Sequence, residues 1–290
     1  MNYRHIYHAG NFADVLKHAV LALVIAHLKR KDTPFRIIDT HAGIGLYDLS
    51  REEAQKTGEW HDGIGRILAD SPPPEIAEIL APYLEVVHAE NVAGSHGPLQ
   101  RYPGSPVIAR RLMRPDDRLV VNEAHPADAA ALTALFAKDR AVKVLALDGW
   151  TALKSLLPPK ERRGLVLIDP PFEEPGEFRR IVEGLAAAHR RFATGTIMIW
   201  YAIKDDRAVR TFAREAAELA IPKVLSAELL VRAPLSAGGL AGSGLIIVNP
   251  PFTLESQLAA LLPYLAERLG QGKGAGDRLI WLTGERVTNP

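Results

Sequence analysis

The sequence predicts an α/β fold, in which a mostly parallel, seven-stranded sheet carries helices on both faces and ends in an antiparallel hairpin. Short apolar runs alternate with longer amphipathic stretches along most of the chain. Hydrophobic residues make up 47% and charged residues 24% of the 290 residues, a balance typical of a chain that buries one large core. Polar turns with glycine or proline follow several apolar runs, as they do at the carboxyl ends of parallel strands.

The first predicted elements are a helix and a buried strand. Asn11 is a suitable helix cap, and a broad apolar stripe runs from it to about Lys31, so this helix should pack on the main domain. Pro34 ends the segment, and Phe35 to Asp39 then forms a short apolar strand.

Strands and helices alternate over the second part of the chain. Further strands are expected at Arg118 to Asn122, Val142 to Leu147, Leu165 to Ile168, Thr196 to Tyr201, Lys223 to Val231 and Gly244 to Val248. Helices are expected at Pro126 to Lys138, Gly149 to Leu156, Glu177 to Arg191, Arg207 to Leu219 and Leu254 to Leu269. The segment Ala233 to Ser243 is too short for a helical crossover and favours a hairpin. Leu279 to Leu282 is a further strand candidate outside the seven.

Residues 47–104 have a different pattern, because glycine, proline and charged residues interrupt short helical stretches such as Ile64 to Leu68 and Glu75 to Glu85. We predict an inserted helical subdomain there. Residues 1–46 then supply the N-terminal arm, the first helix and the first strand of the main domain, and residues 105–290 supply its remainder.

Composition excludes several classes of function. The chain has no cysteine, which rules out disulfide scaffolds, thiolate nucleophiles and Cys-ligated metals, and we predict no metal site. The longest apolar run, Ala19 to Ala26, is far shorter than the roughly 20 residues of a membrane span, and the N-terminus lacks the order of a signal peptide. We therefore expect a cytoplasmic protein. The net charge of +1 neither requires nor forbids a nucleic-acid partner, although several Lys and Arg clusters are present.

The first strand leads into a glycine turn that contains Gly43 and Gly45. Glycine there allows a ligand to approach the backbone. The third glycine of a dinucleotide-binding fingerprint would fall at Asp48, whose carboxylate would repel phosphates, so a nicotinamide-dependent oxidoreductase is disfavoured. A cationic cofactor without phosphate is compatible with this turn.

Two acidic residues follow the next two predicted strands. Glu123 is placed where a carboxylate can accept hydrogen bonds from both ribose hydroxyls of a nucleoside. Asp148 can hold an adenine amino group, and Gly149 leaves room for the ring. Each feature is also common in ordinary turns and helix caps, so they count mainly in combination.

The most informative motif is Asp169-Pro170-Pro171-Phe172, which directly follows an apolar strand. The lone pair of an adenine N6 amine is delocalised into the ring, so the amine is a poor nucleophile. A carboxylate oxygen of Asp169 and the carbonyl of Pro170 can accept its two hydrogens and free the lone pair for attack on a methyl donor. The prolines fix the backbone, and Phe172 can stack on the base.

A second copy of the pattern, Asn249-Pro250-Pro251-Phe252, follows the strand that we expect to be antiparallel. Its carboxyl end should emerge at the opposite edge of the sheet, so we assign Asn249 to a structural turn. The segment Tyr3 to Asn11 is dense in aromatic and basic side chains, which suits base stacking and phosphate contact; its alternative is a packed terminal arm.

At this point several motifs together resemble the bacterial 23S ribosomal RNA adenine-N6 methyltransferases of the RlmJ family, over essentially the whole chain. The motifs are Tyr3-Arg4-His5, His8 to His18, Asp39-Thr40-His41-Ala42-Gly43, Tyr102 to Pro106 and Ile168 to Phe172. A parallel sheet that ends in an antiparallel hairpin is also typical of Rossmann-like methyltransferases. One departure is Phe172, where such enzymes often have tyrosine; stacking is retained but a hydroxyl hydrogen bond is not.

The resemblance implies a monomeric class I methyltransferase that uses S-adenosyl-L-methionine to modify one adenosine of 23S rRNA, in its protein-free or early-assembly form. It implies Asp169 for catalysis, together with Pro170 and Phe172 of the same loop, and Tyr3, Arg4 and Phe172 for substrate contact. The expected cofactor contacts are Lys17, His18, His41, Gly43, Ser105, Glu123, Asp148 and Gly149.

Two alternatives remain open from the residues alone. The same amine chemistry serves a DNA adenine-N6 or cytosine-N4 methyltransferase, and only the N-terminal motif and the lack of a large DNA-recognition domain favour RNA. A non-catalytic rRNA-binding assembly factor would also suit the basic clusters, but it has little reason to keep Asp169 beside a stacking ring.

Overall fold

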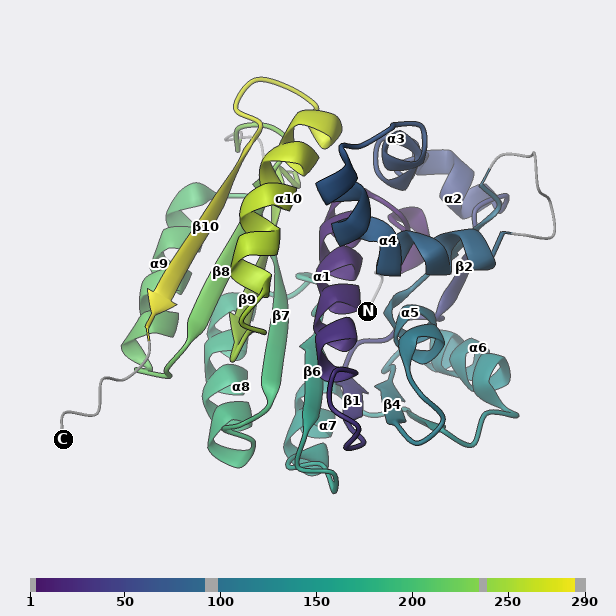
Figure 1. Ribbon diagram of the computed structural model, residues 1–290, viewed down its shortest axis with the longest axis vertical. Helices are drawn as coiled ribbons and strands as arrows, with labels where there is room; N and C mark the ends of the chain where they lie inside the picture. Colours follow the sequence, from purple (N-terminus) through teal and green to yellow (C-terminus); the bar gives the residue numbers. More distant parts are fainter. Residues whose placement is uncertain (1–3, 92–98, 235–238, 285–290) are drawn as a thin grey trace.

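The computed structural model describes residues 4–91, 99–234 and 239–284. Its centre is an eight-stranded sheet with the order β10-β8-β9-β7-β6-β1-β4-β5 (Figure 1). The strands of this sheet are β1 (Arg36–Asp39), β4 (Arg118–Asn122), β5 (Val142–Leu145), β6 (Gly164–Ile168), β7 (Thr196–Ile203), β8 (Val224–Leu230), β9 (Gly242–Val248) and β10 (Gly276–Thr283). The helices are η1 (His5–Tyr7), α1 (Phe12–Leu28), α2 (Glu52–Thr57), α3 (Ile64–Leu68), α4 (Pro74–Ala89), α5 (Ser105–Leu112), α6 (Pro126–Phe136), α7 (Gly149–Leu156), α8 (Glu177–Arg191), α9 (Asp206–Glu218) and α10 (Leu254–Leu269).

The parallel half of the sheet consists of β5, β4, β1, β6 and β7, whose neighbours all pair in the same direction. β9 is inserted between β7 and β8 and runs antiparallel to both. These findings confirm the predicted α/β class and the antiparallel hairpin. All carboxyl ends of the parallel strands therefore meet at one edge, which is where a ligand site is expected.

The predicted number of seven strands is wrong, because β10 adds an eighth. β10 contains the candidate Leu279 to Leu282 and pairs antiparallel with β8 at the edge of the sheet. Two of its apolar residues, Ile280 and Trp281, are 52% and 39% exposed. An edge strand buries little of either face, so its sequence lacks the continuous apolar run that marks the central strands.

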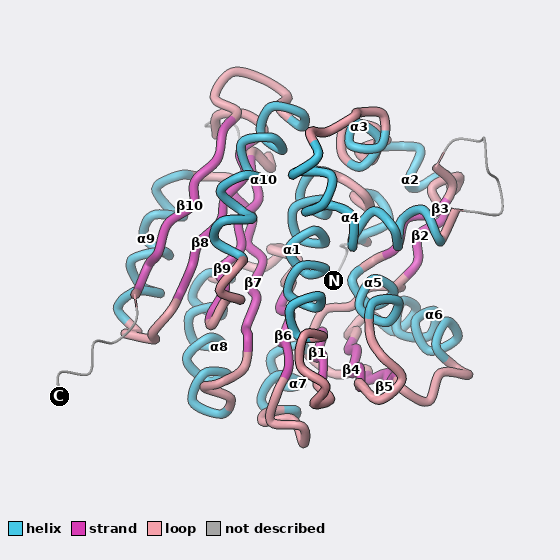
Figure 2. Tube along the Cα trace, in the orientation of Figure 1, coloured by secondary structure: helices cyan, strands magenta, loops and turns pink. Residues whose placement is uncertain are grey.

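Helices cover both faces of the sheet (Figure 2). On one face α1 packs against α4, α5, α10, β6 and β9, and the other face is covered by α7, α8 and α9. Asn11 caps α1, since its side-chain oxygen accepts the backbone N–H groups of Ala13 and Asp14. Within α1 only Ala26 and His27 are not buried. This helix is therefore part of the core and carries its N-terminal end to the carboxyl edge of the sheet.

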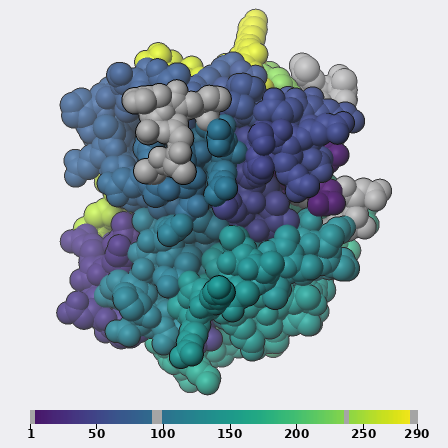
Figure 3. All heavy atoms as spheres, turned by 90° about the vertical axis from the view of Figure 1, so that its right-hand side faces the viewer, coloured from purple at the N-terminus to yellow at the C-terminus, as the bar shows by residue number. Residues whose placement is uncertain are grey.

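Residues 47–104 contain α2, α3 and α4, and they also contribute to a small antiparallel sheet of β2 (Leu46–Asp48) and β3 (Arg101–Pro103). Sequence patterns did not indicate this sheet, because strands of three residues are too short to show a period. In the space-filling view the inserted residues cover the upper part of one face and meet the residues that follow them (Figure 3). The division into subdomains stays a prediction.

Within the described ranges no helix is both long and apolar enough to cross a membrane. The same residues hold no group of three or more His, Cys, Asp or Glu side chains arranged to bind a metal ion.

Candidate functional site

A cavity of about 650 Å³ opens at the carboxyl edge of the parallel strands. Its walls come from the first turns of α1, from the loops after β1, β4 and β6, and from the end of β7. Ligand pockets of this size occur at the same edge in other open α/β sheets.

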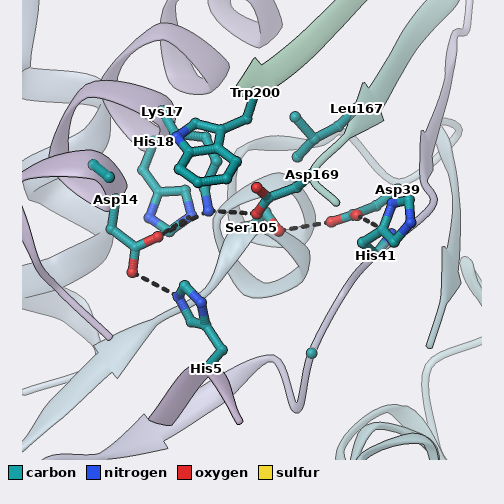
Figure 4. A network of polar contacts seen from close by, with 12 residues as sticks. His5, Asp14, Lys17, His18, Asp39, His41, Ser105, Leu167, Asp169 and Trp200 are labelled. Atoms are coloured by element: carbon teal, nitrogen blue, oxygen red, sulfur yellow. Dashed lines mark hydrogen bonds and ion pairs between the residues drawn. The ribbon is translucent and has the colours of Figure 1, made fainter. Parts of the chain in front are cut away.

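The loop after β6 places Asp169 in this cavity beside Lys17 of α1 (Figure 4). The Lys17 Nζ donates to Asp169 Oδ2 at 2.5 Å and lies 2.9 Å from Asp14 Oδ1. Burial alone would lower the pKa of Lys17, but the two carboxylates outweigh it and raise the pKa above its ordinary value. Lys17 is therefore a permanent cation that orients Asp169 through one carboxylate oxygen, Oδ2.

Asp14 connects this pair to the segment before α1. Its Oδ2 accepts hydrogen bonds from His5 Nε2 and from the backbone of Gly10, each at 2.9 Å. Burial would raise the pKa of Asp14, but the charges of His5 and Lys17 hold it well below the ordinary value. Asp14 is thus an ionised carboxylate in the core that fixes Lys17 and the chain before it.

His18, next to Lys17 on α1, lies at the back of the cavity. Its Nδ1 is 2.7 Å from the Tyr102 hydroxyl, which in turn is 2.9 Å from that of Tyr83. Burial lowers the pKa of His18 to about 3, so the ring is neutral. A neutral ring can sit beside Lys17 without repelling it.

A second buried carboxylate, Asp39 at the end of β1, holds two predicted cofactor contacts. Ser105 Oγ donates to Asp39 Oδ2 at 2.7 Å, and the backbone N–H of His41 donates to Oδ1 at 3.2 Å (Figure 4). Burial raises the pKa of Asp39 to about 7, and the neighbouring Asp169 adds to this. The ring of His41 has its pKa lowered to about 4, again mainly by burial.

Two glycines keep this side of the cavity open. A Cβ on Gly149 would lie 2.3 Å from His41 Nε2, and a Cβ on Gly43 would lie 2.2 Å from the Tyr47 hydroxyl. Gly43 also has a φ of +60°, in the left-handed region. Any larger residue at either position would displace a ring that lines the cavity.

Both carboxylates after β4 and β5 contact backbone N–H groups. Glu123 accepts from Gly43 and from His125 at 2.8 Å, one on each oxygen. Asp148 caps α7 through a hydrogen bond from the Thr151 N–H at 2.8 Å. Each carboxylate oxygen has further lone pairs, so these contacts orient the groups without exhausting their capacity to accept ligand hydroxyl or amino hydrogens.

The ring of Phe172 faces two other aromatic rings. It packs edge-on against Phe178 and Trp200, with centroids 5.2 Å and 5.6 Å away. The φ of Phe172 is 54°, which places the ring at a sharp turn after the two prolines. Trp200, on β7, also lines the cavity.

The structure brings most of the sequence-predicted residues together. Those that line the one cavity are Lys17, His18, His41, Gly43, Ser105, Glu123, Asp169, Pro170 and Phe172. Asp148 and Gly149 lie beside it against His41, and Arg4 lies outside it in an ion pair with Asp128 at 3.1 Å. Tyr3 is outside the described residues.

Sequence reasoning missed four residues of the site: Asp14, His5, Asp39 and Trp200. Three of them, His5, Asp14 and Asp39, belong to motifs that carry the family resemblance, which was a usable signal. Trp200 and the role of Asp14 depend on contacts that no local pattern reveals.

Comparisons with known proteins agree over nearly the full length. Residues 32–283 match the family model described as ribosomal RNA large subunit methyltransferase D, RlmJ. Proteins named ribosomal RNA large subunit methyltransferase J are 42% identical in Escherichia coli and 41% in Haemophilus influenzae; each match covers 98% of this chain and 100% of the relative. A crystal structure from Legionella pneumophila superposes with a TM-score of 0.84 at 33% identity, and the match covers 96% of this chain and 99% of that one.

Proposed function

The chain belongs to the RlmJ family of ribosomal RNA large-subunit methyltransferases and depends on S-adenosyl-L-methionine; from this premise we propose that it methylates the N6 amine of an adenosine in 23S rRNA. The observation that supports this reaction best is the Asp169 loop, whose oriented carboxylate, two prolines and aromatic ring all line one cavity. These are the groups that an exocyclic aromatic amine requires.

The residues around the cavity fit the cofactor. S-adenosyl-L-methionine supplies an electrophilic methyl group on a sulfonium, and it carries an adenosine without phosphates. Glu123 offers carboxylate oxygens to ribose hydroxyls, and Asp148 offers one to the adenine amine. The space that a Cβ on Gly149 would fill is left open beside His41. Lys17, His18 and Ser105 complete the proposed cofactor contacts, and nearby carboxylates suit a cationic ligand.

On the substrate side, Asp169 and Pro170 hold the target amine. Lys17 occupies Asp169 Oδ2, so Oδ1 accepts one amino hydrogen, and the Pro170 carbonyl accepts the other. Both acceptors draw the nitrogen lone pair out of conjugation, and Asp169 receives the surplus proton once the new N–C bond has formed. Phe172 stacks on the base, with Tyr3 and Arg4 as further RNA contacts.

We assign the reaction to RNA in its protein-free or early-assembly form, because a base must leave its stack to enter such a cavity. We further propose that one copy acts alone, in the cytoplasm, and without a metal ion. All proposed reacting groups come from one chain, and none of them requires a Lewis acid.

The deciding experiment is methyl transfer to protein-free large-subunit rRNA by wild type and Asp169→Ala, with mass spectrometry of the digested nucleosides. We expect N6-methyladenosine with wild type alone, while both proteins bind the cofactor. Arg179→Ala, which removes a surface cation paired with Glu183 on α8, is the control and should methylate as wild type does. Product in duplex DNA but not in rRNA would overturn the substrate, and methylation by Asp169→Ala would overturn the catalytic assignment.

A further inference from the structure

The cavity extends beyond the Asp169 loop onto one face of β7. Trp200, Ala202 and Lys204 line this part. They are spaced two residues apart, so their side chains project from the same face of the strand. Met198, the preceding residue on that face, is fully buried. The cavity therefore exposes this face of the chain from Trp200, beside the Asp169 loop, to Lys204, which directly follows β7.

Arg232 reaches the same part of the cavity from the end of β8. Its guanidinium donates to Gln271 Oε1 at 3.2 Å and to the carbonyl of Leu240 at 2.9 Å. Because β9 lies between β7 and β8, two strand spacings of about 4.8 Å place the backbones of Lys204 and Arg232 about 10 Å apart. Their long side chains can converge on one extended ligand.

Among the residues that the structure describes, no carboxylate neutralises either cation. In residues 4–91, 99–234 and 239–284 no carboxylate lies within 4.0 Å of the Lys204 ammonium or the Arg232 guanidinium. Both partners of Arg232 are neutral acceptors, which fix its direction and leave its charge available. This differs from the rest of the surface, where many arginines are paired with acids.

The opposite half of the cavity is acidic. Glu123 and Asp128 line it on the side of β4, and Asp128 forms an ion pair with Arg4 at 3.1 Å. Two more carboxylates on the side of the inserted helices are already paired, Glu59 with His8 at 2.9 Å and Asp62 with Arg66 at 2.5 Å. Glu173 of the Asp169 loop lines the cavity as well, so carboxylates predominate in its lining except at the end formed by Lys204 and Arg232. The acidic part suits a cationic cofactor, and the basic end suits a polyanion.

We propose that Lys204 and Arg232 bind the RNA phosphates that flank the target adenosine, with Trp200 as the aromatic floor between these phosphates and Asp169. Phosphate contacts supply most of the affinity of proteins for nucleic acids and fix the register of the chain, while stacking tolerates any base. This inference rests on the proposed function, because it concerns the substrate of the same cavity.

The test compares Lys204→Gln, Arg232→Gln and their double variant with wild type, using an rRNA fragment that wild type methylates. We expect KM for RNA to rise about 5- to 10-fold for each single variant, and kcat to change less than about two-fold. The slope of log affinity against log salt should fall by about 0.7 for each phosphate that is no longer bound. Cofactor affinity, measured by calorimetry without RNA, should stay at the wild-type value.

Matched controls are Lys160→Gln and Arg191→Gln, which remove exposed cations at the opposite edge of the sheet. Lys204→Arg and Arg232→Lys keep the charge and should restore most of the RNA affinity. If the double variant keeps the wild-type KM and salt slope, the inference is overturned. The proposed function would still stand in that case, because wild type methylates the fragment. If wild type methylates no rRNA fragment, the proposed function fails instead, and the salt dependence of RNA binding by the variants still decides the inference.

Discussion

Two loops of this protein contain the same acceptor-Pro-Pro-Phe pattern, at opposite edges of one sheet. Asp169 follows the parallel strand β6 and faces the cavity, whereas Asn249 follows the antiparallel β9. Val248, the last residue of β9, pairs with Ile197 near the start of β7. The direction of a strand thus decides what a sequence motif does, as the sequence-based assignment of Asn249 to a structural turn anticipated.

The side chains in the two loops have different roles. Asn249 donates through Nδ2 to the carbonyls of Ala193 and Gly195 at 2.8 Å and 2.9 Å, which closes the turn before β7. Asp169 instead contacts a buried lysine that is shared with a second acid. One loop satisfies backbone groups, and the other holds a carboxyl group oriented toward a cavity.

The largest expected effect separates the two motifs directly. Asp169→Asn should lower kcat about 10²- to 10³-fold, because an amide cannot receive the proton and loses the charge that Lys17 orients. Adding Asn249→Asp, which recreates Asp-Pro-Pro-Phe at the other edge, should not restore activity. Single-turnover kinetics with saturating cofactor measure this. Recovery to within about ten-fold of wild type in the double variant would show that edge and strand direction do not matter.

The second-largest expected effect concerns Asp39, the buried carboxyl group at the carboxyl edge of the parallel strands. The pKa of Asp39 is raised from 3.8 to about 7, so between these values the folded state retains a proton that the unfolded state has released. Stability therefore falls as pH rises through this window and stays low above it. The amide side chain of the Asp39→Asn variant cannot ionise, so the variant avoids this loss. As pH rises from about 4 to about 7, the free energy of unfolding of the variant should increase relative to that of wild type by about 1–4 kcal/mol.

Chemical denaturation across that pH range checks this prediction. Asp48→Asn is the control, because hydrogen bonds from Ser50 lower the pKa of Asp48 and the change in stability should have the opposite sign. A constant difference between Asp39→Asn and wild type at all pH values would contradict the argument.

The third effect tests the structural loop. Asn249→Ala removes both side-chain hydrogen bonds and places alanine at a φ of 50°, so the free energy of unfolding should fall by about 1–3 kcal/mol. Asn249→Gly tolerates the φ and should lose less. Denaturation midpoints report both, and kcat of the folded protein should be unchanged within about two-fold. A large loss of kcat with normal stability would give this loop a catalytic role.

The smallest expected effect is that of Phe252→Ala, which is compared with the same change at Phe172 in the other loop. Phe252 is 77% exposed and contacts only the guanidinium of Arg30 and the edge of His27 among cationic and aromatic groups described. Phe252→Ala should cost less than about 1 kcal/mol of stability and leave RNA methylation unaltered. Phe172→Ala should raise KM for RNA by about ten-fold or more, since it removes a stacking surface. Equal effects of both variants on KM would remove the distinction.

Sequence patterns predicted most of the sheet, because buried parallel strands have continuous apolar runs. They also predicted that the site lies at the carboxyl ends of these strands, because recognisable turn residues follow them. They missed β10 as part of the main sheet and the pair β2 and β3, where partial burial or short length erases the pattern. These strands are specified by their partners rather than by their own residues.

The same limit applies within the site. The Asp169 loop was predictable, because its proline and acidic residues are adjacent in sequence. The ion pair of Asp169 with Lys17 joins residues 152 positions apart, and no spacing rule reveals such a contact. Trp200 and Lys204 likewise line the cavity together only because of how β7 is packed in the fold, and their sequence spacing alone did not indicate a site.

The position of α1 has a consequence for biosynthesis. This helix is synthesised well before β9 and α10, on which it packs and which end only at Val248 and Leu269. At about 5–20 residues per second, roughly 10–50 s pass before these partners emerge. During that interval α4 and α5 can cover part of α1, but the face that packs on β9 and α10 still lacks its partners, so apolar surface of the nascent chain stays uncovered. An enzyme whose proposed substrate is the RNA of the large subunit is thus itself completed only when nearly all of its chain has left a ribosome.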